Sequence, residues 1–393
     1  MNQHLFALVE LTRNRVPQPL RHAAQRWLPL GALKQRWREA REPLAAIRSC
    51  DENRVGLEQP VGILANRAQY HCLYMRACLE MGVPFRVLDL GADDWLQQVQ
   101  RSGCTRILVW PDATLSPWAQ LFKDLCELLE TELGLRVYPG HADCWPYENK
   151  YRLRDWLMAR NLPHPRTWVF TDREAALTFT AQAHLPLVMK TGFGAAATGV
   201  RIVRERSALR AAVKRAFGRG FVPAGHDRRD IEWGRVLLQE YLPDVVEWRL
   251  VRIGDSYFGH PKGKRGDFHS GSGRVDWTFP QTRHLELLHQ VCELGGFSSM
   301  AADVFETVDG CLLINELQTV FGASTSIHQM MQDGSPGRVR RASDGSWLFE
   351  AGDFARNCCA NLRVLTLIER TWSEIELDPD APGLALAKLA ETQ

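Results

Sequence analysis

The pattern of apolar residues changes near the middle of this chain, and that change constrains the fold more than any other feature. From residue 59 to about 145, short apolar runs alternate with longer amphipathic segments, which predicts a parallel sheet with helices on both faces. After about residue 165, short β-rich segments dominate and two helical segments interrupt them, which predicts an α+β unit with antiparallel sheets. The expected fold class is therefore α/β plus α+β.

We expect four regions along the chain. They are a basic helical N-terminal arm (1–58), an α/β domain (59–145), an α+β domain (146–330) and a C-terminal helical segment (331–393). Residues 145–170 connect the two domains, and Pro163 and Pro165 end a helix there. The arm carries apolar residues among arginines, so it either packs on the body or contacts a partner, another copy of the chain or a membrane surface.

The composition argues against several classes of function. The formal net charge of +2 gives no indication of a nucleic-acid partner, and no stretch approaches the roughly 20 apolar residues of a transmembrane segment. We recognise no signal peptide, and the ten cysteines include no CxxC pair, so we expect a cytoplasmic protein. No GxGxxG follows the first expected strand, so a dinucleotide site is not supported.

Four features of the second half could carry chemistry. The first is a Gly/Ala-rich loop, 191–199, which follows Lys190 at the end of an apolar strand. Backbone N–H groups of such loops approach phosphates closely, and a lysine adds a positive charge. The alternative is a purely structural turn, and the spacing does not match a Walker P-loop.

The second and third features are polar groups at strand ends. Glu240 ends one strand and Glu247 begins the next. Glu240 could accept from an adenine amino group and Glu247 from ribose hydroxyls. The alternative is that both are exposed carboxylates of a hairpin. The loop 259–274 could recognise phosphates or carboxylates, or be a solvated basic loop. Its cations are Lys262, Lys264, Arg265 and Arg274.

The fourth feature is an expected hairpin, 301–319, with a Val-Asp-Gly turn. The turn brings Asp303 close to Glu316, and Gln318 takes the next position on the same face. Carboxylates inside apolar strands are costly unless they are paired or bind a cation. Together these oxygens could bind Mg²⁺ alongside nucleotide phosphates.

Taken in this order, the four features resemble the ATP-grasp superfamily, which includes D-alanine–D-alanine ligase, glutathione synthetase and RimK-type glutamate ligases. The resemblance runs from about Pro60 to Ser326 and includes the connector around Lys150. It implies a Rossmann-like domain followed by an ATP-grasp domain of two α+β subdomains. It also implies ATP and Mg²⁺ as cofactors.

The resemblance implies roles for individual residues. Lys150 and Lys190 would contact the phosphates of the nucleotide, and the loop containing Gly194 would close over the triphosphate. Adenine would be held by Glu240 together with the backbone of Tyr241 and Leu242, and the ribose by Glu247. Arg265, with Arg249 or Lys262, would neutralise the transferred phosphate. Asp303 and Glu316 would bind Mg²⁺. This chain departs from the usual Glu-x-Asn by having Gln318, which puts a second metal ion in question.

The mechanism that this resemblance implies has two steps. A carboxylate attacks the γ-phosphate of ATP to give an acyl-phosphate, and an amine or another nucleophile then displaces phosphate. The substrate would be a small-molecule, peptide or glycan carboxylate. Two alternatives stay open, namely a kinase that phosphorylates a hydroxyl and a non-catalytic ATP-binding regulatory protein.

Overall fold

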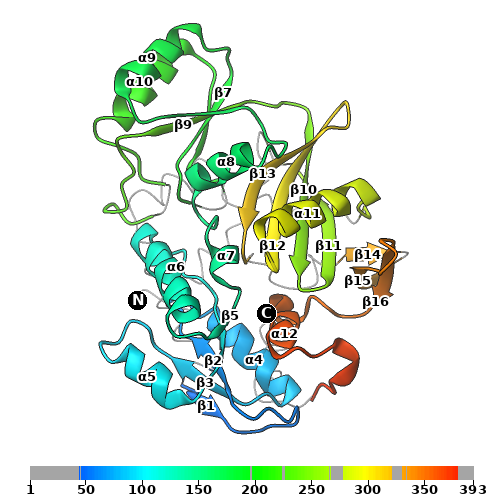
Figure 1. The fold of residues 1–393 in the computed structure, drawn as a ribbon. Helices are drawn as coiled ribbons and strands as arrows, with labels where there is room; N and C mark the ends of the chain where they lie inside the picture. The colour runs from blue at the N-terminus through cyan, green and yellow to red at the C-terminus, as the bar shows by residue number, and fades with distance from the viewer. Residues whose placement is uncertain are drawn as a thin grey trace, which may run out of the picture.

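The computed structural model describes residues 44, 46–194, 197–223, 226–264, 266, 278–320, 330–332 and 334–378. These residues form three sheets with helices packed on them, a mixed α/β arrangement (Figure 1). Most of the predicted N-terminal arm, residues 1–43 and 45, falls outside the described residues, as do Arg265, Arg274 and Ser326. No helix in the described ranges is long and apolar enough to cross a membrane.

The first sheet has the predicted alternation of strands and helices. Its spatial order is β1-β3-β2-β4-β5, with β2 to β5 parallel and the two-residue β1 antiparallel at the edge. The elements are β1 (Ser49–Cys50), β2 (Val61–Leu64), α4 (His71–Met81), β3 (Phe85–Leu88), α5 (Trp95–Ser102), β4 (Arg106–Leu108), α6 (Ser116–Thr131) and β5 (Arg136–Tyr138).

The two faces of this sheet bury separate cores. Ile63 and Leu108 face a core that includes α4 and the C-terminal helix α12 (Arg356–Ile368), whereas Leu64 and Ile107 face a core that includes α5 and α6. Successive residues of a strand point to opposite faces, so these near-continuous apolar strands bury both. The expectation of helices on both faces is confirmed.

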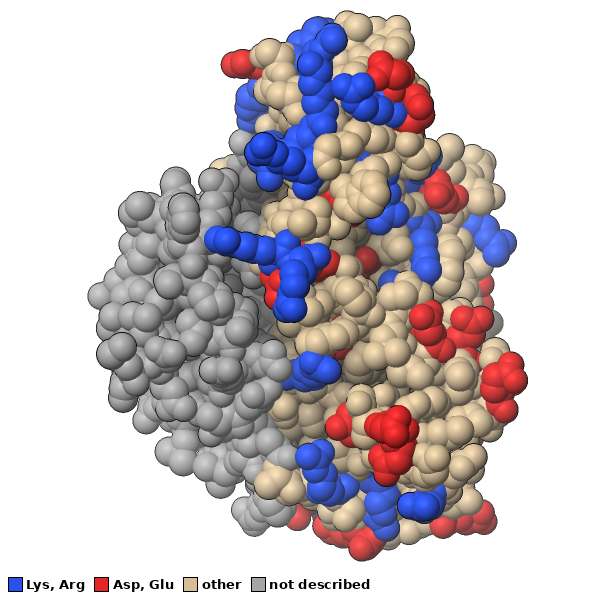
Figure 2. Space-filling view, turned by 90° about the vertical axis from the view of Figure 1, so that its left-hand side faces the viewer, with Lys and Arg blue, Asp and Glu red and all other residues tan. Residues whose placement is uncertain are grey.

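The second sheet is small and antiparallel, in the order β6-β9-β7-β8. Two helices, α9 (Arg173–Gln182) and α10 (Arg206–Ala216), pack on it over an apolar core of their own. The strands are β6 (Thr167–Phe170), β7 (Leu187–Lys190), β8 (Val200–Val203) and β9 (Val236–Glu240). Figure 2 shows Lys and Arg side chains gathered over this upper part of the molecule.

The third sheet is the largest, in the order β13-β12-β10-β11-β15-β14, with β16 pairing to β15. Helix α11 (Thr282–Gly295) packs on it, and α7 (His141–Cys144) and α8 (Lys150–Ala159) lie in the connection from the first sheet. The strands are β10 (Val245–Ile253), β11 (Ser256–Lys262), β12 (Ser299–Thr307), β13 (Leu312–Gln318), β14 (Met330–Gln332), β15 (Ser335–Arg341) and β16 (Trp347–Ala351).

The expectation that the segment from residue 331 is helical is wrong for its first part. Strands β14, β15 and β16 extend the large sheet, and α12 begins only at Arg356. The β15–β16 connection contains Gly345 at φ +84°, a conformation that glycine adopts readily and that permits a tight hairpin. The α12 helix then returns to the first sheet and packs against α4.

Candidate active site

Two lysines from different elements approach the same edge of the large sheet. Lys150 is the first residue of α8, and the side chain of Asn149 caps that helix by accepting from the backbone N–H of Arg152 at 3.1 Å. Lys150 Nζ lies 3.2 Å from Glu316 Oε1 and donates to the carbonyl oxygen of Gly194 at 2.9 Å. Burial opposes its charge, but the carboxylates of Glu316 and Glu148 outweigh burial and raise the pKa of Lys150.

Lys190 ends β7, where its Nζ donates to Oδ1 of Asn315 on β13 at 2.7 Å. Burial lowers the pKa of Lys190 to about 8, and the positive charge of Lys150 acts in the same direction, while Glu316 opposes both. The two lysines are thus fixed by adjacent residues of one strand, although their own elements belong to different parts of the chain.

The start of the loop after Lys190 is fixed by hydrogen bonds to its backbone N–H and C=O groups. Gly194 donates its N–H to Oε2 of the buried Glu148 at 3.0 Å, and Gly192 accepts from the backbone N–H of Lys150 at 3.0 Å. Gly194 has φ +119°, which favours glycine at this position. Burial raises the pKa of Glu148, although Lys150 opposes the shift. Residues 195 and 196 lie outside the described part.

A narrow cleft contains both lysines. Apolar walls next to cationic groups suit a ligand that carries a ring and a phosphate chain. The residues that line it come from α8, from the strands β6, β7, β9 and β13, and from the connector before β6: Lys150, Leu153, Arg154, Leu157, His164, Thr167, Lys190, Leu237, Gln239, Ile314 and Asn315.

The predicted carboxylate pair is divided between two sheets. Glu240, at the end of β9, accepts through Oε1 from the backbone N–H of Arg166 at 2.6 Å. Glu247, on β10, is buried and lies 2.6 Å from Lys262 Nζ, so the alternative of an exposed hairpin carboxylate does not hold for it. Tyr241 and Leu242 lie in the connection between the two strands and are half-buried.

The centre of the site is an acidic pair surrounded by cations. Asp303 and Glu316 lie close together on β12 and β13, as the hairpin pattern predicts, and a register shift between Asp303 and Val304 places them directly opposite each other. Arg249, opposite Asp303 on β10, forms a forked contact with it, Nε to Oδ1 at 2.9 Å and Nη2 to Oδ2 at 3.0 Å. Lys262 contacts Oδ2 as well.

These contacts decide the charge of Asp303. Burial alone would raise its pKa, but Arg249 and Lys262 hold the pKa of Asp303 well below its usual range. Asp303 reciprocally raises the pKa of Arg249 against the effect of burial. Gln318 lies on the same hairpin, with Oε1 3.5 Å from Arg249 Nη2, too long for a strong hydrogen bond.

The carboxylates of this site fit Mg²⁺ only if a bound nucleotide supplies some of the oxygen ligands. Within the described residues, no three His, Cys, Asp or Glu side chains gather into a metal site. Mg²⁺ is commonly held by one or two carboxylates together with substrate phosphates and water, and Asp303 with Glu316 supplies that number. The residues therefore fit an ion that arrives with a nucleotide, rather than one held by the protein alone.

Three residues at this site were not predicted from the sequence. Asn315 precedes Glu316 in an apolar strand, and Glu148 precedes the connector lysine by two residues, so both lay next to a recognised signal. Glu232 accepts from the N–H of Gly192 at 2.7 Å, and nothing local in the sequence distinguishes it. Arg265, predicted for this site, lies outside the described residues.

Comparison with known proteins identifies a fold. No protein family and no curated protein matches the sequence. Among solved structures, N5-carboxyaminoimidazole synthetase from Staphylococcus aureus complexed with ADP is 14% identical, with 83% of this chain and 81% of that chain covered and a TM-score of 0.52. The biotin carboxylase domain of Hydrogenobacter thermophilus 2-oxoglutarate carboxylase, in complex with MgADP, ADP and bicarbonate, is 16% identical over 67% of this chain and 64% of that chain, at a TM-score of 0.52.

A third similar structure is a RimK domain ATP-grasp protein from Sphaerobacter thermophilus, which is 20% identical over 66% of this chain and 90% of that chain, at a TM-score of 0.47. The described residues share their fold with the first two of these solved structures. At these identities the likeness concerns the fold, and the activity must be inferred from the site itself.

Proposed function

We propose that this protein is an ATP- and Mg²⁺-dependent ligase that activates a carboxylate as an acyl-phosphate for attack by an amine or another nucleophile. The observation that carries the proposal is the junction of two lysines and two carboxylates. Lys150 and Lys190 are bound to Glu316 and Asn315, and Glu316 lies opposite Asp303 on the adjacent strand. Such an arrangement provides cations for a triphosphate and carboxylates for its metal ion.

The similar structures support the choice of cofactors. One was solved with ADP and the other with MgADP, and both share this fold. In our proposal the first sheet is a Rossmann-like domain of residues 59–145. The small and large sheets form the two subdomains of an ATP-grasp domain, with the nucleotide in the cleft between them. We place the protein in the cytoplasm.

The nucleotide would be held by groups from both sheets. Lys150 and Lys190 neutralise phosphate oxygens, and the apolar walls of the cleft, such as Leu157 and Ile314, enclose the base. Glu240 accepts from the adenine amino group and Glu247 from the ribose. Asp303, Glu316 and Gln318 would hold Mg²⁺, which neutralises charge on the phosphates.

The protein's own cations have a separate task in this proposal. Arg249 and Lys262 keep Asp303 ionised at neutral pH, so its oxygens are ready to accept a cation. Together with Arg265 they neutralise negative charge on the transferred phosphate. Transfer of a phosphoryl group depends mainly on positioning and charge neutralisation, and it requires no protein nucleophile.

Trapping the intermediate tests this proposal. Purified protein is incubated with ATP, Mg²⁺ and panels of amino acids, peptides and uronic acids, and ADP release is measured with and without hydroxylamine. We expect ADP release to depend on one carboxylate and hydroxylamine to trap a hydroxamate, because acyl-phosphates react with it. A stable phosphorylated product that forms without a nucleophile would indicate the kinase instead. Tight ATP binding with no turnover in any mixture would indicate a regulatory protein.

A further inference from the structure

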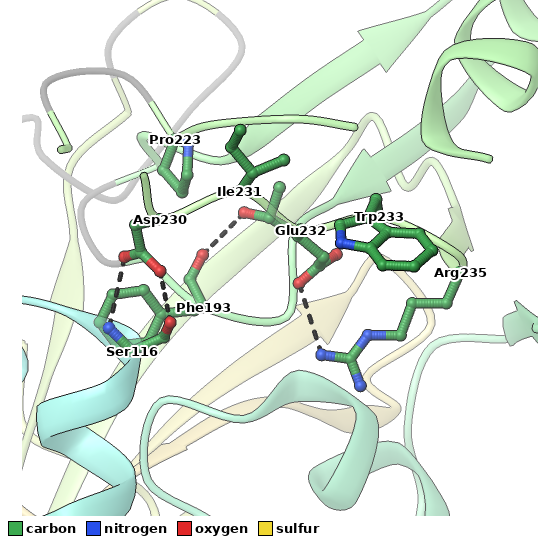
Figure 3. A pocket seen from close by; sticks show the side chains of 9 residues that line it. Ser116, Phe193, Pro223, Asp230, Ile231, Glu232, Trp233 and Arg235 are labelled. Atoms are coloured by element: carbon green, nitrogen blue, oxygen red, sulfur yellow. Dashed lines mark hydrogen bonds and ion pairs between the residues drawn. The ribbon is translucent and has the colours of Figure 1, made fainter. Parts of the chain in front are cut away.

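The segment between α10 and β9, described at residues 217–223 and 226–235, links three parts of the molecule and lines a hollow beside the candidate site (Figure 3). At one end of the hollow, Asp230 binds the first helix residue of α6, accepting from the backbone N–H of Ser116 at 3.3 Å and from its hydroxyl. At the other end, Glu232 lies between the loop after β7 and Arg235. The segment therefore bridges the first sheet's helices and the loop that follows Lys190.

Both carboxylate oxygens of Glu232 are engaged by elements of the candidate site. Oε2 accepts from the backbone N–H of Gly192 at 2.7 Å, and Oε1 accepts from the hydroxyl of Tyr151 on α8 at 2.7 Å. The backbone of Glu232 is itself fixed, because it exchanges two hydrogen bonds with Phe221, at 2.8 and 2.9 Å. One side chain thus joins the loop to the helix that begins with Lys150.

At Gly192 the loop packs closely against the Glu232 carboxylate and the Tyr151 ring. A Cβ atom on Gly192 would overlap the ring of Tyr151 and lie 3.0 Å from Oε2 of Glu232. Arg235 stacks over the Tyr151 ring, 4.0 Å from its centroid, and also lies 3.9 Å from Glu232. Burial and the adjacent Glu232 carboxylate raise the pKa of Tyr151, so its hydroxyl remains a donor.

We propose that Glu232 is a positioning residue for the phosphate-binding loop. This inference rests on the proposed ATP-binding function. Glu232 contacts Gly192, two residues after Lys190, and Gly192 in turn accepts from the backbone of Lys150. By fixing Gly192 it keeps both lysines and residues 191–194 in one arrangement before the nucleotide arrives, so binding requires less ordering.

The test compares three variants with wild type. Glu232→Ala removes both contacts, whereas Glu232→Gln keeps an oxygen that can accept from Gly192. Asp227→Asn is the matched control, because this carboxylate belongs to the same segment but is bonded to Arg229 at the surface. The readouts are amide hydrogen exchange of peptides covering 190–199 in the ATP-free protein, ATP affinity by calorimetry, and the midpoint of thermal unfolding.

We expect exchange in 190–199 to be faster in Glu232→Ala, and ATP binding to be at least about tenfold weaker, since a hydrogen bond to a charged group is lost. In Glu232→Gln the exchange rate and the ATP affinity should both stay closer to the wild-type values. In Asp227→Asn neither the exchange rate nor the ATP affinity should change. Unchanged exchange and affinity in Glu232→Ala would overturn the positioning role, as would a lower unfolding midpoint with unchanged ATP affinity.

Two further outcomes keep the inference separate from the proposed function. If wild type binds no ATP, the proposed function fails, and the exchange measurement still reports whether Glu232 fixes the loop. If Glu232→Ala does not fold, Tyr151→Phe removes only the hydroxyl contact. That variant should raise exchange in 190–199 and weaken ATP binding to a smaller extent, and wild-type behaviour in both would overturn the proposal.

Discussion

Lys190 at the end of β7 donates to Oδ1 of Asn315 on β13 at 2.7 Å, although 125 positions separate the two residues in the chain. This bond joins the small antiparallel sheet to the large one across the cleft. Burial lowers the pKa of Lys190 to about 8, so the protonated form still prevails at pH 7. Its ammonium group is shielded from water and donates to Asn315 instead. A phosphate in the cleft would provide a stronger partner for this ammonium than an amide oxygen does.

We therefore expect Lys190→Met to weaken ATP binding at pH 7 by about tenfold or more, since a charge-assisted contact to phosphate is lost. Isothermal titration calorimetry with MgATP measures the change. Lys214→Met, at an exposed position of α10, is the control and should bind as wild type does. Equal affinities for wild type and Lys190→Met would remove Lys190 from the nucleotide site.

Arg249 and Asp303 provide a prediction about stability. Breaking a buried ion pair by removing one partner typically costs about 3–5 kcal/mol, because a charge remains buried without compensation. Because Lys262 still contacts Asp303 when Arg249 is removed, Arg249→Ala should lower the free energy of unfolding by about 3 kcal/mol, the lower end of this range. Arg249→Lys should cost less, because it keeps a positive charge beside Asp303, although an ammonium cannot make the forked contact. Urea denaturation gives both values.

The matched control for this pair is on the same strand. Arg252 contacts Glu293 at 2.6 Å, but Glu293 is largely exposed, so Arg252→Ala should cost about 1 kcal/mol or less. Similar losses for the Arg249 and Arg252 variants would show that the site contact contributes no more than a surface pair.

Glu316 is the residue whose replacement best tests the metal assignment. From the sequence alone we would expect Glu316→Ala to leave folding nearly intact, because removing one of two repelling carboxylates relieves strain. The structure shows Glu316 paired with Lys150 at 3.2 Å, so the isosteric Glu316→Gln is the better variant. It should reduce Mg²⁺-dependent ATP turnover by about a hundredfold or more, equivalent to about 2.7 kcal/mol of activation free energy.

Turnover is measured as ADP release across a Mg²⁺ titration. Asp309→Asn, in the exposed turn of the same hairpin, serves as the control and should retain wild-type rates. A Glu316→Gln enzyme that keeps the wild-type rate and Mg²⁺ dependence would make Glu316 a structural partner of Lys150 only.

His71 predicts how stability depends on pH. Its Nδ1 accepts from the backbone N–H of Asn66 at 3.1 Å, and burial lowers the pKa of His71 from 6.5 to about 4. Between these values the unfolded chain binds a proton that the folded protein does not. Stability from His71 is therefore complete above about pH 6.5 and is lost as pH falls to about 4, a change of about 3 kcal/mol.

Denaturant titrations from pH 4 to pH 7 measure this slope. His71→Asn keeps a side-chain acceptor and cannot titrate, so its free energy of unfolding should fall less steeply with acid than that of wild type. His184→Asn, at an exposed position, should leave the slope unchanged. Parallel curves for wild type and His71→Asn would mean that His71 does not control acid stability.

Much of the first sheet could be predicted because its signals are local. Strand β2 is a short apolar run, and α6 carries apolar residues at helical spacing, so each element is visible in its own segment. The hairpin of β12 and β13 was equally local, since its Val-Asp-Gly turn marks where the two strands reverse. The exact pairing of Asp303 with Glu316 was not, because it depends on a register shift between Asp303 and Val304. The segment from 347 to 351 was wrongly expected to be helical, because a short apolar run has no decisive period and only its pairing with β15 makes it a strand.

The sequence by itself determined that an α/β part precedes an α+β part, the order of the motifs, and the residue types available for phosphates and a metal ion. Only the tertiary structure decided which of those residues meet. Lys150 was paired with Glu316, Arg249 with Asp303, and Glu232 with Gly192, across 166, 54 and 40 positions of sequence respectively. Periodicity reports only which face of an element is buried, whereas a contact between distant segments depends on how the sheets pack, and no local pattern encodes that.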